Sequence, residues 1–402
     1  MRNEPSSARG ASGATRRLWA SAASAAGIAA VVCAVTGAGA SSASPTHVGG
    51  RALVTHSRQA AGGFKACEVT DTGGIHDESF NESAYNGMKD AVAADPKVTS
   101  TAFLSSSSES NYVPYINQFL SSNCGIIVTV GFDMAQATQT AAVKNPSQKF
   151  TIVDETYPKV YKNLLALHYD TNQDAFLGGY LAAAYAAKYD SSSPAVGTFG
   201  GQNIPTVTIY MDGWVAGVDY YDHLNKASVT AYGWTPTKGS KPNSLAGTGL
   251  FTNNFTDEGT GDTDAKTLMS EGAYVIFPVA GAVGLGAAAA VKAAGGGHVM
   301  EWVDTDGCVS AKQYCSLFIS SVTKGIVTSV EDAVEAAANG TFKGGQYNGT
   351  LANGGVAISP YHDYASKIPG SVTAEIKKLK GLIEANKICT SAICWAKYAP
   401  AS

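Results

Sequence analysis

Short apolar runs alternate with amphipathic segments along most of the chain, starting near residue 64. Residues 64–69 are one such run, and Phe80, Ala84, Met88 and Val92 follow at helical spacing. A short apolar run predicts a buried strand, whereas apolar residues repeated at every fourth position predict a helix with one buried face. This stretch is therefore predicted to form a strand, a loop and a helix.

The alternation continues in two successive sets. In the first we expect strands over residues 64–69, 98–104, 126–130, 149–153 and 164–169, with helices over 79–93, 112–120 and 134–144. In the second we expect strands over 195–199, 229–232, 274–279, 299–303 and 317–322, with helices over 174–188, 206–221, 262–271, 329–338 and 372–386, and one that ends near 292. Apolar strands that alternate with helices predict an α/β fold with parallel sheets flanked by helices. Two sets predict two lobes, with a cleft lined by strand ends.

The first 40 residues have a different composition. Arg16 and Arg17 precede a stretch rich in Ala, Val and Gly that ends in Ala38-Gly39-Ala40, which fits a signal-peptidase site. We therefore expect residues 1–40 to be an export signal and the Ser-, Ala- and Gly-rich residues 41–62 to be a flexible leader. A single membrane span is the alternative, since the apolar stretch is about long enough. Lipidation of Cys33 is a further alternative, although the residues before it match a lipoprotein signal poorly.

Composition narrows the function. The chain has 402 residues, 45% of them hydrophobic, which is enough for two domains with a large core. Its formal net charge is -4, only 15% of its residues are charged, and no basic stripe or basic helix is evident. A role on nucleic acid or on a membrane surface is therefore not expected.

Seven cysteines are present, and six remain if Cys33 is removed with the signal. An even set in an exported protein predicts disulfides, but six cysteines allow fifteen connectivities. Proximity in the sequence favours Cys308–Cys315 and Cys389–Cys394, which leaves Cys67–Cys124. A metal site is the alternative, although the chain has no C-x-x-C pair and its histidines are scattered.

The predicted strand ends carry acids, aromatics, glycines and a lysine. Aromatic faces stack on planar rings, and carboxylates accept hydrogen bonds from hydroxyl and N–H groups. Each residue alone is as well explained as a cap, a core residue or a solvated charge, but together they suit a flat polar heterocycle that bears a hydroxylated tail. The candidates are Asp71, Asp77, Phe80, Asn81, Phe132, Asp154, Phe277, Gly281, Asp304 and Lys324.

Catalytic signatures are missing from the sequence. It has no G-x-S-x-G elbow, no H-E-x-x-H and no G-x-x-x-x-G-K-[ST] loop. The pair Asp304 and Asp306 is the alternative, because two carboxylates can do acid–base work or bind a cation. We expect no catalytic activity and no cofactor.

Four blocks of sequence carry a resemblance to a known family. They are residues 69–81 (VTDTGGIHDESFN), 130–132 (VGF), 275–281 (VIFPVAG) and 302–306 (WVDTD), with weaker matches at 213–218 and 321–324. In these blocks the chain resembles the Bmp, or purine-nucleoside-receptor-A-like, substrate-binding proteins of ABC importers. Two departures are His76, where the family often has an acid or Asn, and Ala282, where a second Gly is common.

The resemblance implies a two-lobed periplasmic-binding-protein fold of type I with three hinge crossings. One lobe would hold residues 64–170 plus 299–323, and the other 171–298 plus 324–395. The two lobes would close on a nucleoside whose base stacks between Phe80 and Phe277. Asp71, Asn81 and Asp154 would lie near the base, and Asp304 and Lys324 near the ribose, with Gly281 beside them.

The implied function is that of an exported receptor, at the extracellular face of the plasma membrane or secreted. Its partners would be a small-molecule ligand, most simply a purine nucleoside, and the permease and ATPase subunits of an importer. Contact with the membrane would come through the permease or a lipid anchor. The alternatives are another heterocycle such as riboflavin, an extracellular sensory protein of the same fold, and an enzyme acting on nucleosides.

Overall fold

The computed structural model describes residues 63–190 and 192–400 of the chain. The predicted export signal over 1–40, the leader over 41–62 and Cys33 lie outside the described residues. Within the described residues, no helix combines the length and the apolar character needed to cross a membrane.

The first sheet has six strands, all paired in parallel, in the order β13-β5-β4-β3-β1-β2. Its central strand β3 is Ile-Ile-Val-Thr-Val and is buried along its whole length, as expected where helices cover both faces of a sheet. One face packs on α1 (Phe80–Ala94) and α9 (Ile326–Ala338), and the other on α2 (Tyr112–Leu120) and α3 (Ala135–Lys144). The strands are β1 (Phe64–Val69), β2 (Val98–Leu104), β3 (Ile126–Val130), β4 (Lys149–Val153), β5 (Leu164–Tyr169) and β13 (Gly345–Gly349).

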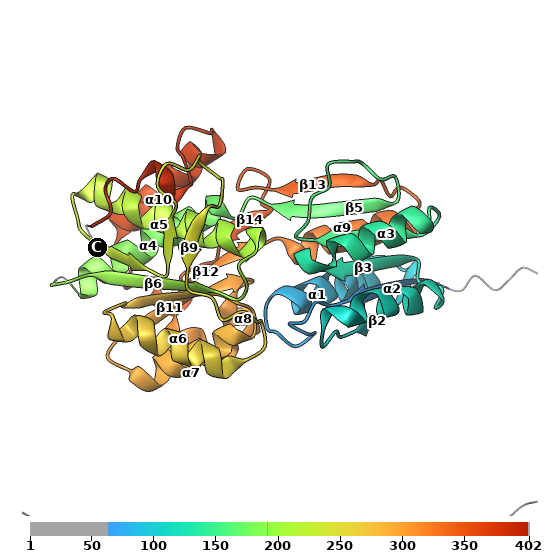
Figure 1. The fold of residues 1–402 in the computed structure, drawn as a ribbon, viewed down its shortest axis with the longest axis horizontal. Coiled ribbons are helices and arrows are strands. Elements are labelled where there is room, and N and C mark those ends of the chain that lie inside the picture. The colour runs from blue at the N-terminus through green and yellow to red at the C-terminus, as the bar shows by residue number, and fades with distance from the viewer. Residues whose placement is uncertain (1–62, 191, 401–402) are drawn as a thin grey trace, which may run out of the picture. The chain divides into compact units, whose positions relative to one another are not determined.

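The second sheet has the order β14-β12-β11-β10-β6-β7 and is parallel except for the pair β12–β14. Helices α4 (Asn172–Tyr189) and α5 (Pro205–Asn225) lie on one face, and α6 (Glu258–Ser270) and α7 (Val283–Ala294) on the other (Figure 1). Helix α10 (Gly370–Glu384) packs on α4, and the short α8 (Gly307–Ser310) follows β11. The strands are β6 (Ala195–Gly200), β7 (Thr230–Tyr232), β10 (Val275–Val279), β11 (Val299–Asp304), β12 (Phe318–Lys324) and β14 (Val356–Ile358).

Helices α4 and α5 approach each other closely because glycines line their contact. A Cβ on Gly179 would lie 1.8 Å from the carbonyl oxygen of Trp214, and one on Gly217 would lie 2.1 Å from that of Phe176. Neither position accepts a side chain without moving the backbone, so glycine is required at both for this close packing.

The sheets divide the chain differently from the predicted lobes. Residues 299–323 were expected in the first lobe, but β11 pairs with β10, and β12 pairs with β11, in the second sheet. Helix α9 and strand β13, which were expected in the second lobe, belong with the first sheet. The chain therefore passes between the sheets after β5, between β12 and α9, and between β13 and β14. The expected boundary was wrong because an apolar strand fits either sheet, and pairing between distant strands decides which one it joins.

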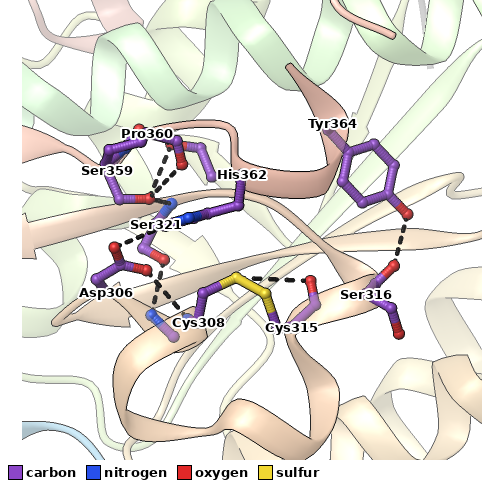
Figure 2. Close-up of a disulfide and its surroundings, with 11 residues drawn as sticks. Asp306, Cys308, Cys315, Ser316, Ser321, Ser359, Pro360, His362 and Tyr364 are labelled. Carbon is purple, nitrogen blue, oxygen red and sulfur yellow. Dashed lines mark hydrogen bonds and ion pairs between the residues drawn. A yellow bond between two sulfur atoms is a disulfide. The ribbon is translucent and has the colours of Figure 1, made fainter. Parts of the chain in front are cut away.

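All three expected disulfides are present, which confirms the pairing favoured by proximity. Cys67 in β1 bonds Cys124 just before β3, with their Cα atoms 5.9 Å apart. Cys308 bonds Cys315 (Figure 2), and Cys389 bonds Cys394. The alternative of a metal site built on these thiols is therefore wrong.

Candidate functional site

Strand ends of both sheets surround one cavity. The empty space within it, including the solvent at its open mouth, is about 540 Å³. Concave sites where a few polar groups converge among apolar walls are where small molecules usually bind. The segments after β1, β3, β4 and β10 contribute to it, together with Asp304 and Lys324 at the ends of β11 and β12. Nine of the ten predicted ligand residues line it: Asp71, Asp77, Phe80, Asn81, Phe132, Asp154, Gly281, Asp304 and Lys324. That they bind a ligand stays a prediction.

Asp71 and Asn81 hold the loop after β1 against the first turn of α1. Asn81 Nδ2 donates to Asp71 Oδ1 at 2.8 Å, and Gly73 N donates to the same oxygen at 2.8 Å. Gly131 lies opposite with φ +112°, and a Cβ there would come 2.9 Å from Asp71 Oδ2. Burial raises the pKa of Asp71 to about 7, although its hydrogen bonds from Asn81 and Gly73 oppose the rise. Near neutral pH this group can therefore both accept and donate a hydrogen bond at the cavity wall.

Asp77 caps α1 with its side chain, although Ser79 occupies the N-cap position. The Asp77 carboxylate accepts from Ser79 N at 3.1 Å, Asn81 N at 2.8 Å and Glu82 N at 3.1 Å. Ser79 makes no capping bond, and its Oγ lies 3.1 Å from both Val303 O and Asp304 Oδ2. A carboxylate suits the positive end of a helix better than a hydroxyl does, which leaves Ser79 free to join α1 to β11.

The predicted stacking residue Phe277 does not reach the cavity. It is fully buried, and its ring stacks on Trp214 at a centroid distance of 5.7 Å and an interplanar angle of 25°. Phe80 does line the cavity and is half-buried. The prediction for Phe277 was wrong because β10 is covered by helices on both faces, and this side chain points toward α5.

Phe255 and Tyr210 are the aromatic residues that the second sheet's side contributes instead. Phe255 lies in the loop before α6, and its Cβ comes 3.6 Å from where a Cβ on Gly73 would stand. Sequence reasoning missed it, although a signal exists. Asp257 follows two residues later and caps α6 by accepting from Gly259 N at 2.9 Å. The signal is therefore position, because Phe255 lies just before a capped helix, as Asp71 lies before α1.

Lys324 is the charged centre of the cavity. Its ammonium pairs with the carboxylates of Asp154 and Asp304, the latter at 3.2 Å, and lies 4.8 Å from the Phe80 ring centroid and 5.0 Å from that of Tyr210. Tyr210 also donates its hydroxyl to Asp304 Oδ1 at 3.1 Å. Burial lowers the pKa of Lys324, but the two carboxylates outweigh this and raise it above the ordinary value. The lysine therefore stays charged and links a strand end of each sheet.

Asp154 and Asp304 occupy equivalent positions, one at each of these strand ends. Both have left-handed backbone, with φ of +65° and +66°. Asp tolerates this conformation better than bulkier residues, and such strained positions often mark ligand sites. With Asp71, Asp77 and Asp133 also in the lining, carboxylates outnumber the single lysine. The site favours uncharged ligands rich in hydrogen-bond donors and disfavours phosphates.

Asp306 and His76, which the sequence analysis also singled out, are not part of the cavity lining. Asp306 accepts from Cys308 N at 3.0 Å and pairs with His362 Nε2 at 2.7 Å (Figure 2), so it does not act together with Asp304. Cys308 is near both, but its sulfur is bonded to Cys315 and is not free as a thiolate ligand. His76 is exposed.

Comparison with known proteins agrees with this fold. The family described as "ABC transporter substrate-binding protein PnrA-like" (Bmp) matches residues 64–239 and 250–388. The chain is 28% identical to the "ABC transporter nucleoside-binding protein BmpA" of Lactococcus lactis subsp. cremoris over 312 residues, 73% of this chain and 81% of the relative. It is 27% identical to an uncharacterized lipoprotein of Pyrococcus abyssi over 75% of this chain and 70% of the relative.

Among solved structures, a solute-binding protein of an ABC transporter system from Aeropyrum pernix K1 has the same fold. It superposes with a TM-score of 0.70 at 23% identity, over 81% of this chain and 92% of that one. The fold class predicted from the sequence is thereby confirmed. Proteins of this family bind solutes and do not catalyse reactions on them. The chain belongs to the Bmp family, the PnrA-like substrate-binding proteins of ABC transporters.

Proposed function

We propose that this ABC transporter substrate-binding protein binds a nucleoside, most simply a purine nucleoside, on the outer side of the plasma membrane. The observation that carries the proposal is that the cavity combines two sets of groups that meet at Phe80. Phe80 and Phe255 offer aromatic faces beside Asp71 and Asn81 at one end. Lys324 and its two carboxylates form the other end, with the ammonium 4.8 Å from the Phe80 ring centroid, so Asp154, which the resemblance puts near the base, is assigned here to the ribose end. The first end suits a flat base with N–H and acceptor groups, and the second suits the hydroxyls of a ribose.

The ligand would be held by closure of the two lobes. The loop before α1 and strand β11 of the second sheet are already in contact, since Ser79 Oγ lies 3.1 Å from Asp304 Oδ2 and Trp302 Nε1 donates to the Glu78 carbonyl at 3.2 Å. A ligand that contacts both sides favours the closed arrangement by its differential affinity for it. The closed form would then dock on the permease, whose ATPase drives import. The name of the Lactococcus lactis relative supports a nucleoside as cargo.

Calorimetric titration tests the choice of ligand. The purified chain would be titrated with adenosine, guanosine, inosine, cytidine, uridine and riboflavin. We expect purine nucleosides to bind with a Kd well below about 1 mM, which corresponds to only about -4 kcal/mol. Riboflavin binding without nucleoside binding would replace the proposal by its alternative, and no binding of any nucleoside would refute it.

Single substitutions test the two ends separately. Phe80→Ala and Phe255→Ala should each weaken nucleoside binding by roughly 1–3 kcal/mol, the usual cost of losing a base–aromatic stack. Asp304→Asn should weaken binding of nucleosides more than binding of the free bases, because only the former carry the ribose hydroxyls. Equal losses for nucleosides and free bases would contradict the ribose assignment.

A further inference from the structure

A second cavity adjoins the candidate ligand site, with about 290 Å³ of space counted out to its mouth. Asp154 and Thr206 line both cavities, so these two side chains form the partition between them. Asp154 is fixed by Lys324, whereas Thr206 is half-buried in the first turn of α5. The remaining walls are mainly apolar and come from Tyr169, Pro205, Ile209 and Leu245.

Leu245 belongs to a segment that sets this chain apart from its family. The family match is interrupted at residues 240–249, so the segment that contributes Leu245 is an addition to the family's pattern. It is held in place by the hairpin of β8 (Trp234–Pro236) and β9 (Gly247–Gly249), and Thr237 N donates to Ala246 O at 2.7 Å.

The hairpin and its tip are tied to the second lobe at both ends. At the base, Trp234 Nε1 donates to Asp212 Oδ1 at 3.2 Å. At the tip, Asn172 Nδ2 lies 3.4 Å from Asn243 Oδ1 and donates to Thr390 Oγ1 at 2.7 Å. The added segment is therefore held in place by hydrogen bonds and forms one wall of the second cavity.

The polar groups of this cavity indicate what it can hold. Thr171 contributes to its lining, but the residue is fully buried and its Oγ1 is closed off from the cavity space, so it offers no hydrogen bond to a ligand. His168 is the other polar wall, and its Nε2 lies 3.6 Å from Asp170 Oδ1. The carboxylate of Asp154 at the partition disfavours an anionic group.

We propose that the second cavity is a subsite for a small uncharged substituent on the sugar end of the ligand, so that the protein accepts 5′-substituted nucleosides. This rests on the proposed function, which puts the base at Phe80 and Phe255 and the ribose at Lys324. A substituent that passes Asp154 and Thr206 must then start from the sugar. With the ring hydroxyls facing the charged groups, the exocyclic 5′ carbon is the position from which it can extend. Leu245 sets the size of the group that fits.

The test compares ligands that differ only at the 5′ position. The full chain would be titrated with adenosine, 5′-methylthio-5′-deoxyadenosine and adenosine 5′-monophosphate. We expect the methylthio compound to bind at least as tightly as adenosine. The phosphate should bind at least about a hundredfold more weakly, because a charged group would meet Asp154.

Two matched variants then locate the effect. Leu245→Trp fills the cavity and should weaken the methylthio compound at least about tenfold, while adenosine stays within about twofold. Ser244→Trp adds the same bulk at the neighbouring exposed position, which does not line the cavity, and should change neither ligand. Comparable unfolding midpoints of both variants would show that each is folded.

The outcomes separate the two proposals. If adenosine binds and the methylthio compound is excluded, or if Leu245→Trp weakens both ligands equally, the subsite is refuted and the nucleoside proposal stands. If the phosphate binds as well as the methylthio compound, the preference for an uncharged group is refuted. If no nucleoside binds, the proposed function itself fails and the subsite fails with it.

Discussion

Replacing Lys324 by Met tests whether the charges at the centre of the cavity are desolvated. Only 4% of the Lys324 side chain, 6% of that of Asp154 and 8% of that of Asp304 is exposed. Met keeps most of the volume and removes the charge, which leaves two carboxylates close together in a buried site. Breaking a buried ion pair by removing one partner typically costs about 3–5 kcal/mol. We expect the free energy of unfolding at pH 8 to fall by that amount.

The loss should depend on pH in a defined direction. Burial raises the pKa of Asp154 although Lys324 opposes the rise, so removing the ammonium raises that pKa further and the folded protein binds a proton there more tightly. The destabilisation is then largest at pH 8 and shrinks toward pH 5 as Asp154 becomes protonated. Adding Asp154→Asn to the variant should recover part of the loss at pH 8, because one of the two unpaired charges is removed.

Urea unfolding followed by tryptophan fluorescence at pH 5 and pH 8 measures these effects. Lys266→Met is the matched control, since Lys266 is 59% exposed and pairs with Asp262 on the surface of α6 at 2.7 Å. Exposed pairs contribute little, so the control should be close to wild type. If Lys324→Met were as mild as the control at pH 8, the three charged groups would be hydrated in solution and the argument from burial would be wrong.

Three further predictions use the same unfolding assay. Asp71→Asn should flatten the pH dependence of stability. Because the pKa of Asp71 is about 7 in the folded protein in place of the usual 3.8, the wild-type free energy of unfolding falls by up to about 4 kcal/mol as the pH rises from 4 to 8. A variant with the same pH dependence as the wild type would contradict this. Removing the Cys67–Cys124 disulfide by a double Ala substitution should lower the free energy of unfolding by about 4 kcal/mol, given the sequence separation of 57 residues. No change would mean that the unfolded chain is already compact in this region. Phe277→Ala should cost about 3–5 kcal/mol as a core truncation, and a loss of ligand affinity without a loss of stability would return Phe277 to the site.

Much of the first sheet could be predicted because its signals are local. The run at 126–130 becomes β3, and the spacing that starts at Phe80 becomes α1. The acids at strand ends meet at one cavity because parallel strands bring their carboxyl ends to the same edge of a sheet. Asp154 and Asp304 could thus be named without a structure, although each is ambiguous by itself.

The failures share a cause that lies in non-local structure. A strand buried on both faces has no polar side, so the sequence of β10 does not say whether Phe277 faces the cleft or the helix behind it. Phe255 stands in a loop, where no periodicity marks its direction. The membership of β11 in a sheet depends on its pairing with β10, more than 20 residues away, as the register of Val275 with Val299 shows.

The position of Lys324 connects the ligand site with the hinge. Lys324 is the last residue of β12, and the chain leaves for the first lobe at the next residue, Gly325, whose N–H donates to Gly355 O at 2.8 Å beside another crossing. The lysine also pairs with Asp154 of the first sheet and Asp304 of the second. A ligand hydroxyl that bonds these carboxylates therefore acts on both sheets within one residue of a crossing. Because closure responds only to contacts that differ between the open and closed forms, these contacts, more than stacking on one aromatic face, are the ones that can couple binding to closure.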